Sequence, residues 1–444
     1  MISKEILQDL LMLDDSAGGM PDAQLLRDYL TSGMPHGEPI CMSLGGTWDR
    51  IAPGLAEFLS DTPKSAHGYQ LSLHGLPRLR TALAEHLRSV HRIPDSAARG
   101  RDWDVAVAWT GTRSAMFDFG RLVKDRCQRP GRRPVVLIAG PAWDYAGVFS
   151  PLGYQIRYLP LRSTEGFLPN AAELDRIVAQ IDADPAAQLA LVVVNAQHNP
   201  TAVNWSSGFV AQMLAVAGCA GAGVLIDDAY FNVHDEGVKP TSALKMMIEA
   251  GSLGFGAPWL AVQSMGKQFG SSGWGIGSLI ASVETLDALV HTYRLHHTLM
   301  SSGMLQHAMA DWLQSPDCAH FLARQRVQLT ETRATAEAQF VKRLGYPGSA
   351  VHVGECTPYI VVDVPPAYAE SEDTAHEFRT RCFERTGVLT APIWPWPMPK
   401  PEAAQPPQLR LYLGSGISGV REAVRRMADA GLVYSAVRSS EVRE

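Results

Sequence analysis

Cysteine is scarce in this sequence, and so are the features that mark secreted or membrane proteins. The 444 residues include six cysteines, which lie far apart and form no Cys-x-x-Cys pair. That spacing excludes the usual disulfide-framework and zinc-finger patterns, so we expect reduced thiols in a cytoplasmic protein. No apolar run is long enough to span a bilayer, and the first residues carry acids instead of the apolar core of a signal peptide.

Charge of one sign is scarce as well. The formal net charge is −6, only 19% of the residues are charged, and no long run of like charges occurs. A surface for nucleic acid or an anionic membrane needs clustered positive charge, so we expect neither partner. The 46% of apolar residues is ordinary for a globular enzyme, and the length predicts two or three domains, or one large and one small.

Strand-like and helix-like segments alternate from about residue 102 onward. Short apolar runs predict strands at 105–109, 135–138, 155–159, 189–194, 224–226 and 259–262. The run at 189–194 is apolar throughout, as in a parallel strand that is covered on both faces. This alternation predicts a doubly wound α/β domain, whose ligands lie beyond the carboxyl ends of the strands.

The pattern changes in the last third of the chain. We expect a helix over 286–313, then a long helix over 321–343 that begins a smaller α+β unit with strands near 360–362 and 409–413. The segment 391–401 is rich in proline and tryptophan, which excludes helix or central strand and predicts a loop. The predicted parts are an N-terminal arm with part of the small domain (1–48), a large domain (49–315) and a C-terminal small domain (316–444).

One lysine stands among small residues directly after a predicted strand. Lys267 follows Gly266 and precedes Gly270 and two serines, so a ligand can approach its amine closely. If desolvated, this amine becomes a neutral nucleophile at working pH. For a lysine considered alone, a surface position in a flexible loop is the commoner explanation.

Other polar residues also follow predicted strands. Thr110 begins a Thr-Gly-Thr-Arg-Ser stretch that opens a helix, whose N–H groups and positive end suit an anion. Asn199 follows the buried strand, and Asp227 ends the next one, with Tyr230 three residues later. Taken alone, Thr110 is more commonly a helix cap, Asn199 fits an Asn-Pro turn equally well, and Asp227 also fits a helix cap. A buried acid at a strand end also suits pairing with a cationic ring nitrogen.

In chain order these residues form a set: Asn199-Pro-Thr, Asp227-x-x-Tyr230 and Ser264-x-x-Lys267. The set resembles the class I/II aminotransferase family of fold type I pyridoxal-phosphate enzymes, over about residues 40–420. The resemblance implies pyridoxal 5′-phosphate as cofactor and a large cofactor-binding domain with a mostly parallel sheet of seven strands. It also implies a smaller α+β domain, a homodimer, and action on an α-amino acid through a Lys267 Schiff base and a quinonoid.

The resemblance also implies roles for single residues around the cofactor. Lys267 would form the Schiff base and move the proton at the substrate α-carbon. Asp227 would pair with the pyridine nitrogen and keep the ring an electron sink. Asn199 and Tyr230 would donate hydrogen bonds to the ring 3-oxygen. Trp143, in a Pro-Ala-Trp step, matches the ring that stacks on the cofactor.

The phosphate and the substrate carboxylate have their own predicted residues. Gly111, Thr112 and Ser264 resemble the phosphate cup, and Tyr69 matches a tyrosine that reaches the phosphate of a neighbouring subunit. Arg410 matches the arginine that binds the substrate α-carboxylate in a bidentate manner. Gly45 and Gly46 match the backbone beside that carboxylate, together with Asn199.

Two departures from the family pattern bear on the reaction. Where the family usually places a phosphate-binding arginine, eight residues after the lysine, this chain has Gly275. We expect Arg113 to replace that cation, and we expect the space beside the phosphate to admit a bulky second substrate. The loop at 391–401 brings Trp394 and Trp396, which serve either as platforms for a flat substrate or as core packing.

These departures leave the reaction open at this point. Aminotransfer is the family's commonest activity. The alternatives are γ-elimination or substitution on S-adenosylmethionine, carbon–carbon bond formation with a second small molecule (an annulation, for example), and an amino-acid oxidase or hydroxylase that uses oxygen.

Four histidines raise the question of a metal. They are His291, His296, His297 and His307, and their spacings of five, one and ten match no ligand pair four residues apart on a helix. We therefore expect no metal site from them.

Overall fold

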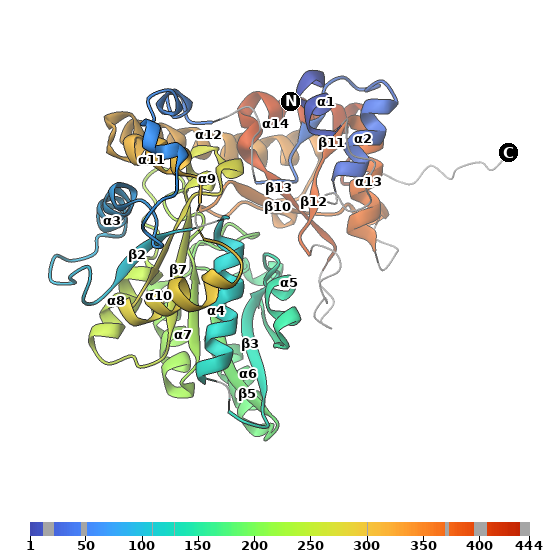
Figure 1. Cartoon of the computed structure of the whole chain (residues 1–444). Helices are drawn as coiled ribbons and strands as arrows, with labels where there is room; N and C mark the ends of the chain where they lie inside the picture. Colours follow the sequence, from blue (N-terminus) through green and yellow to red (C-terminus); the bar gives the residue numbers. More distant parts are fainter. Residues whose placement is uncertain are drawn as a thin grey trace.

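The structure is a computed structural model that describes residues 1–11, 22–45, 51–108, 110–127, 129–299, 301–368, 373–394 and 406–435 (Figure 1). Its helices are α1 (Lys4–Leu11), α2 (Ala23–Thr31), α3 (Pro77–His91), α4 (Thr112–Cys127), α5 (Tyr145–Phe149), α6 (Ala171–Ala183), α7 (Ser207–Ala220), α8 (Ala243–Ser252), α9 (Met265–Phe269), α10 (Val283–Ala288), α11 (Gly303–Gln314), α12 (Pro316–Leu344), α13 (Thr374–Thr386) and α14 (Gly416–Asp429). Figure 1 shows the large sheet with its helices on one side of the molecule and a smaller unit beside its end.

The large sheet has seven strands in the order β2-β8-β7-β6-β5-β3-β4. Their bounds are β2 (Asp104–Val107), β3 (Arg133–Gly140), β4 (Gln155–Pro160), β5 (Ala187–Val194), β6 (Gly223–Asp227), β7 (Trp259–Ser264) and β8 (Gly277–Ala281). Only β8 runs antiparallel to its neighbours, and the other pairings are parallel. The predicted mostly parallel, doubly wound sheet is confirmed.

Both faces of this sheet are covered, which explains the apolar strands. Val192 and Val194 of β5 pack in a cluster that includes residues of α3, α6, α7 and α8. Val193 faces the other way and packs in a cluster that includes residues of α4, α5 and α10. Every residue of β5 is buried, and from Leu189 to Val194 all of them are apolar, as expected of a strand that is covered on both faces.

The smaller unit is built on a four-stranded sheet in the order β12-β13-β10-β9 and on a two-stranded sheet of β1 and β11. The strands are β1 (Ile40–Cys41), β9 (Val351–His352), β10 (Tyr359–Asp363), β11 (Val388–Leu389), β12 (Ala391–Pro392) and β13 (Gln408–Tyr412). Its apolar cluster joins residues of β10, β13, α12 and α14 to Ile40 and Met42 near the N-terminus. The first part of α12 packs instead in the cluster of the large sheet, through Cys318 and Leu322. The predicted domain boundaries at 48 and 315 therefore remain a proposal.

One expectation about a single element is wrong, and one strand was missed. The helix expected over 286–313 is broken into α10, a π-helical turn η6 (Leu289–Tyr293), a 3₁₀ turn η7 (Arg294–His296) and α11. The chain leaves the helix because Arg294 is buried there and donates to the Leu299 carbonyl, which fixes a non-helical turn before α11 starts. Strand β8 was not predicted, since its Gly-Ser-Leu-Ile-Ala sequence is short and begins with glycine.

None of the helices in the part of the chain that the structure describes is both long and apolar enough to cross a membrane.

Candidate active site

Lys267 lies in the first turns after β7, at the carboxyl end of the large sheet. Ser264 ends β7 and caps α9, because its hydroxyl accepts from the Lys267 backbone N–H at 3.3 Å. The Lys267 amine is partly buried and donates to the Gly45 carbonyl at 2.7 Å. Burial, followed by the charge of Arg410, lowers the pKa of this amine to about 8. A substantial neutral fraction is therefore present near neutral pH, as a nucleophilic lysine requires.

Asp227 is buried at the end of β6 and has two donors. Tyr145 donates its hydroxyl to Oδ2 at 2.6 Å, and the Ala229 N–H donates to Oδ1 at 3.1 Å. Burial is the main cause that raises the pKa of Asp227, and these donors oppose it. A cationic group placed beside this carboxylate would favour its ionised form.

Asn199 follows β5 and contacts the smaller unit. Its N–H donates to the side-chain oxygen of Asn195 at 2.9 Å, and Asn195 in turn donates to the Asp227 carbonyl at 2.6 Å. The Asn199 side-chain oxygen accepts from Arg410 Nη1 at 3.2 Å. These bonds connect the ends of β5 and β6 to β13.

Arg410 lies on β13 with its guanidinium between the two units. Besides Asn199, its Nη2 donates to the Ser43 carbonyl at 2.6 Å, and the guanidinium carbon lies 4.5 Å from the centre of the Tyr359 ring. Its Nε is buried and has no acceptor among the described residues. An unsatisfied buried donor on a guanidinium fork is the group that a carboxylate would complete.

Gly45 lies against two tyrosines. The hydroxyls of Tyr230 and Tyr359 are 2.6 Å apart, and burial raises the pKa of Tyr230 well above its usual value. A Cβ on Gly45 would lie 1.9 Å from the Tyr359 hydroxyl and 2.6 Å from that of Tyr230. Only glycine therefore fits at position 45. Gly46, predicted beside it, lies outside the described residues.

The start of α4 is the predicted anion cradle. Thr112 is its first residue, and the N–H groups of the first helical turn have no acceptor within the helix. The Gly111 N–H is already engaged, because it donates to the Gly275 carbonyl at 2.8 Å. Gly275 has φ +64, and a Cβ there would lie 3.3 Å from the Gly111 nitrogen. The backbone conformation at position 275 thus favours glycine over the arginine that is usual in the family.

Arg113 lies beside Trp143. It donates to Asp144 at 2.9 Å, and its guanidinium carbon lies 4.3 Å from the centre of the Trp143 ring. The Trp143 ring meets Tyr145 edge-on at 5.2 Å. A continuous series of contacts therefore runs from the start of α4 to the end of β6, through Arg113, Trp143, Tyr145 and Asp227.

Two of the predicted residues stand apart from this network in a single chain. The Tyr69 side chain is 80% exposed, and Leu71 two residues later is 99% exposed. Trp394 packs edge-on against Tyr158 at 5.2 Å, so it serves as core packing here, and Trp396 lies outside the described residues.

Three residues of the site were missed from sequence. Tyr145, Asn195 and Tyr359 each hydrogen-bond a predicted site residue. Asn195 and Tyr145 follow strands, which was an available signal, whereas Tyr359 reaches the site only because the two units pack together.

The comparison with protein families is decisive. The family model for aminotransferase class I and II matches residues 60–427.

The chain belongs to the aminotransferase class I and II family.

Relatives and solved structures agree with this family. LL-diaminopimelate aminotransferase 2 of Trichormus variabilis is 23% identical over 395 residues, which cover 82% of this chain and 88% of the relative. Among structures, substrate-bound BacF from Bacillus subtilis aligns with a TM-score of 0.74 and 19% identity, covering 95% of this chain and 98% of the other. A double mutant of aspartate aminotransferase from Thermus thermophilus aligns with a TM-score of 0.73 and 18% identity, covering 94% and 97%.

The protein is a pyridoxal-phosphate-dependent transferase of aminotransferase type. The residues of this aminotransferase fit the cofactor on chemical grounds. A lysine amine with a lowered pKa suits its aldehyde, a buried carboxylate suits its ring nitrogen, and a helix N-terminus suits its phosphate. Neither the family match nor the relatives favours the alternative reactions on S-adenosylmethionine or with oxygen.

The predicted attachment of the cofactor to Lys267 can be tested through the pKa of its amine. The amine reacts only when neutral, so the rate at which the apoenzyme binds pyridoxal phosphate covalently should rise about tenfold per pH unit below 8 and level off above it. Stopped-flow absorbance across pH 6–10 measures this profile. Because the Arg410 charge contributes to the lowered pKa, Arg410→Gln should move the midpoint to higher pH. A flat profile, or a midpoint near that of free lysine, would contradict the prediction.

Proposed function

We propose that this enzyme transfers the amino group of an α-amino acid to a 2-oxo acid. The observation that carries the proposal is the pairing of Lys267, with its lowered pKa, and Arg410, whose buried Nε has no acceptor among the described residues. The amine supplies the base and the attachment point, and the guanidinium supplies a place for the substrate carboxylate. When bound, pyridoxal phosphate supplies the electron sink and carries the amino group.

The residues around the cofactor ring would have different roles. Lys267 would hold the cofactor and then, once freed, move the proton at the substrate α-carbon. Asp227 would pair with the ring nitrogen, and Tyr145 holds this carboxylate in place through its hydroxyl. Asn199 and Tyr230 would donate to the ring 3-oxygen. Trp143 would stack on the ring face.

The substrate carboxylate would bind at Arg410, whose orientation is already fixed. The Asn199 side-chain oxygen and the Ser43 carbonyl each accept a hydrogen bond from one of its terminal nitrogens, and the Tyr359 ring packs against the guanidinium. The backbone near Gly45 and Gly46 would close over the same carboxylate. The Lys267 amine, now bonded to Gly45, would leave that carbonyl when the cofactor binds.

The phosphate would lie at the start of α4, with Thr112, Gly111 and Ser264 around it. Gly275 offers no charge there, and we propose that Arg113 provides it. Its guanidinium lies over Trp143, so its charge is at the edge of the ring site, and Asp144 is its present partner.

Replacing Arg113 with alanine should weaken pyridoxal-phosphate binding by about tenfold. A hydrogen bond to a charged group is worth about 1.5–3 kcal/mol, and we take the low end because the Arg113 side chain is 52% exposed. Equilibrium dialysis of the cofactor measures the change. Arg121→Ala, on the same helix but engaged with Asp118, is the matched control and should leave the affinity unchanged. Equal affinity in Arg113→Ala and wild type would remove Arg113 from the phosphate site.

We also propose a cytoplasmic homodimer. Among the side chains that the structure describes, five cysteines carry free thiols, which supports a reducing compartment: Cys41, Cys219, Cys318, Cys356 and Cys382. The exposed Tyr69 and Leu71 support a subunit contact, in which Tyr69 would reach the phosphate of the partner subunit. Light scattering of wild type and Leu71→Ser tests the contact, since the variant should dissociate at a higher protein concentration.

The test of the reaction is a single half-turnover. The cofactor-loaded enzyme is mixed with a panel of L-amino acids that includes LL-diaminopimelate, S-adenosylmethionine and arginine, without any 2-oxo acid acceptor. Aminotransfer predicts one 2-oxo acid released per active site and then no further product until an acceptor is added. Continuous product formation, loss of a γ-substituent or uptake of oxygen would reject aminotransfer in favour of the other reactions.

A further inference from the structure

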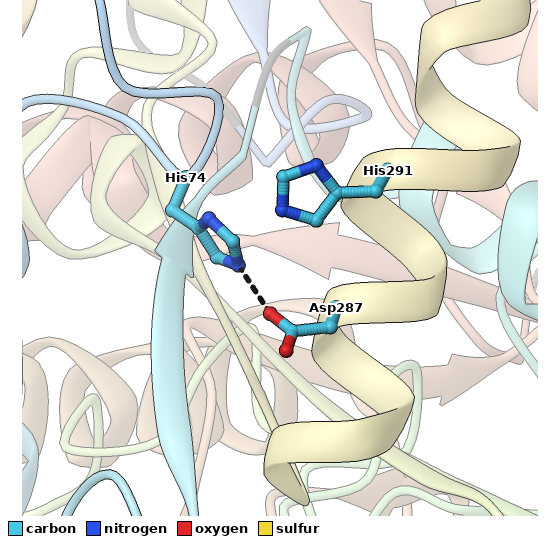
Figure 2. A group of neighbouring side chains, drawn as sticks. All are labelled: His74, Asp287 and His291. Carbon is cyan, nitrogen blue, oxygen red and sulfur yellow. Dashed lines mark hydrogen bonds and ion pairs between the residues drawn. The ribbon is translucent and has the colours of Figure 1, made fainter.

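His74, Asp287 and His291 converge where the loop before α3 meets α10 and the π-helical turn η6 (Figure 2). One ligand atom from each residue lies within 4.8 Å of the other two. His74 Nε2 is 3.0 Å from Asp287 Oδ1, and the two imidazole rings have their centres 5.2 Å apart. None of the three belongs to the proposed active site.

The helix places two of these side chains on one face. Asp287 lies at the end of α10 and His291 lies in η6, four residues later, so both point toward the same side, as Figure 2 shows. The spacing of the histidines in the sequence did not reveal this group, because its second member on the helix is an aspartate. Its other histidine, His74, lies 213 residues before Asp287 in the chain.

His74 is held in place by its own loop. Its carbonyl accepts from the Val107 N–H at 2.8 Å, which ties the loop to β2. Gly75 follows with φ +97, and a Cβ there would lie 2.4 Å from the Val107 side chain. The loop is therefore packed tightly on the sheet, and the imidazole is presented from a fixed backbone.

The chemistry of the set suits a divalent transition metal. Two imidazoles and a carboxylate are ligands that Zn²⁺ prefers, and three protein ligands leave one position for water. Ligand atoms around tetrahedral zinc are about 3.3 Å apart, so the set needs a modest contraction. The Asp287 side chain is 56% exposed, which leaves it free to move and gives solvent access to the fourth position.

One nearby charge opposes a cation. Arg80 lies close enough that its charge, after burial, helps to lower the pKa of His74. Its guanidinium is paired with Asp104 at 2.7 Å and donates to the Val105 carbonyl at 2.7 Å, so its charge is largely balanced.

We propose that His74, Asp287 and His291 bind one divalent transition-metal ion of the zinc type, with water completing the coordination. The ion joins the loop before α3 to the π-helical turn after α10. It lies outside the proposed cofactor site, so its binding is measured without reference to turnover.

The test uses the cofactor-loaded enzyme with Cys219→Ser, because Cys219 is an exposed thiol that could bind zinc by itself. Titration with Zn²⁺ against a chromogenic chelator should give one site per chain with micromolar or tighter affinity. His291→Ala and Asp287→Asn should each weaken this affinity by tenfold or more. His320→Ala, an exposed histidine on α12, is the matched control and should bind like the parent.

A second readout separates binding from misfolding. Zn²⁺ should raise the melting temperature of the parent by a few degrees, and should raise that of Asp287→Asn much less, because a ligand stabilises the state that binds it. Mg²⁺ and Ca²⁺ prefer oxygen ligands, so at the same concentration they should not raise the melting temperature of either protein. Equal Zn²⁺ affinity in the parent, His291→Ala and Asp287→Asn would overturn the proposal, as would affinity weaker than millimolar.

Discussion

Replacing Lys267 with alanine should lower the rate of 2-oxo acid formation by at least about a thousandfold. Its amine is proposed both to hold the cofactor and to move the α-proton, and the loss of a positioned base alone costs about 10²–10⁴ in rate. The lost attachment point adds to this effect. Single-turnover measurements under saturating cofactor report the chemical step directly.

The matched control for this variant is Lys245→Ala. Lys245 lies on α8 with a 39% exposed side chain, 3.8 Å from Glu249, and should be dispensable. Small primary amines should restore part of the rate in Lys267→Ala, since they can enter the space of the missing side chain and act as the base. A Lys267→Ala enzyme that stays within tenfold of wild type would refute the assignment of Lys267.

Replacing Arg410 with glutamine should lower kcat/KM for amino acids by about 10²–10⁴. Two charge-assisted hydrogen bonds to the substrate carboxylate are worth about 1.5–3 kcal/mol each. Arg410→Lys keeps the charge but loses the fork, so its loss should be smaller but still clear. Steady-state kinetics with a carboxylate-free amine as comparison substrate isolates the effect. The kcat/KM of Arg410→Gln for that amine should be close to the wild-type value.

Arg381→Gln is the control for this pair of variants. Arg381 also lies over a tyrosine ring, 5.4 Å from the centre of Tyr368, but on the exposed side of α13. It should leave kcat/KM unchanged. If Arg410→Gln lowered kcat/KM for the amine as much as for the amino acid, Arg410 would act on the fold or on Lys267 and not on the substrate carboxylate.

The architecture was predictable because burial leaves a direct record in sequence. A strand that is covered on both faces is expected to be apolar, and residues 189–194 of β5 are apolar throughout. Strand β8 left no such record, since its pairing with β2 and β7 depends on neighbours that are distant in the chain. The break between α10 and α11 was hidden for a similar reason, because Arg294 is drawn inside by carbonyls of Leu73 and Leu299.

The predicted phosphate cup shows a limit of a different kind. Sequence identified Gly275 as a missing charge, but not the reason that the position accepts glycine. The positive φ and the close approach to Gly111 supply that reason. Likewise, Arg113 was expected to replace the missing cation, but only the structure shows that its present partners are Asp144 and Trp143.

The sequence by itself determined the fold class, the family and the ordered residues from Asn199 to Lys267, since each follows a strand and strand ends meet at one edge of a parallel sheet. Only the tertiary structure decided how far Lys267 is desolvated, which donors hold Asp227, and that Arg410 and Tyr359 reach the site from the smaller unit. It alone brought His74 to Asp287 and His291. The physical reason is the same in each case: contacts between segments that are distant in the chain, and the desolvation that these contacts cause, arise from packing, and local sequence does not encode them.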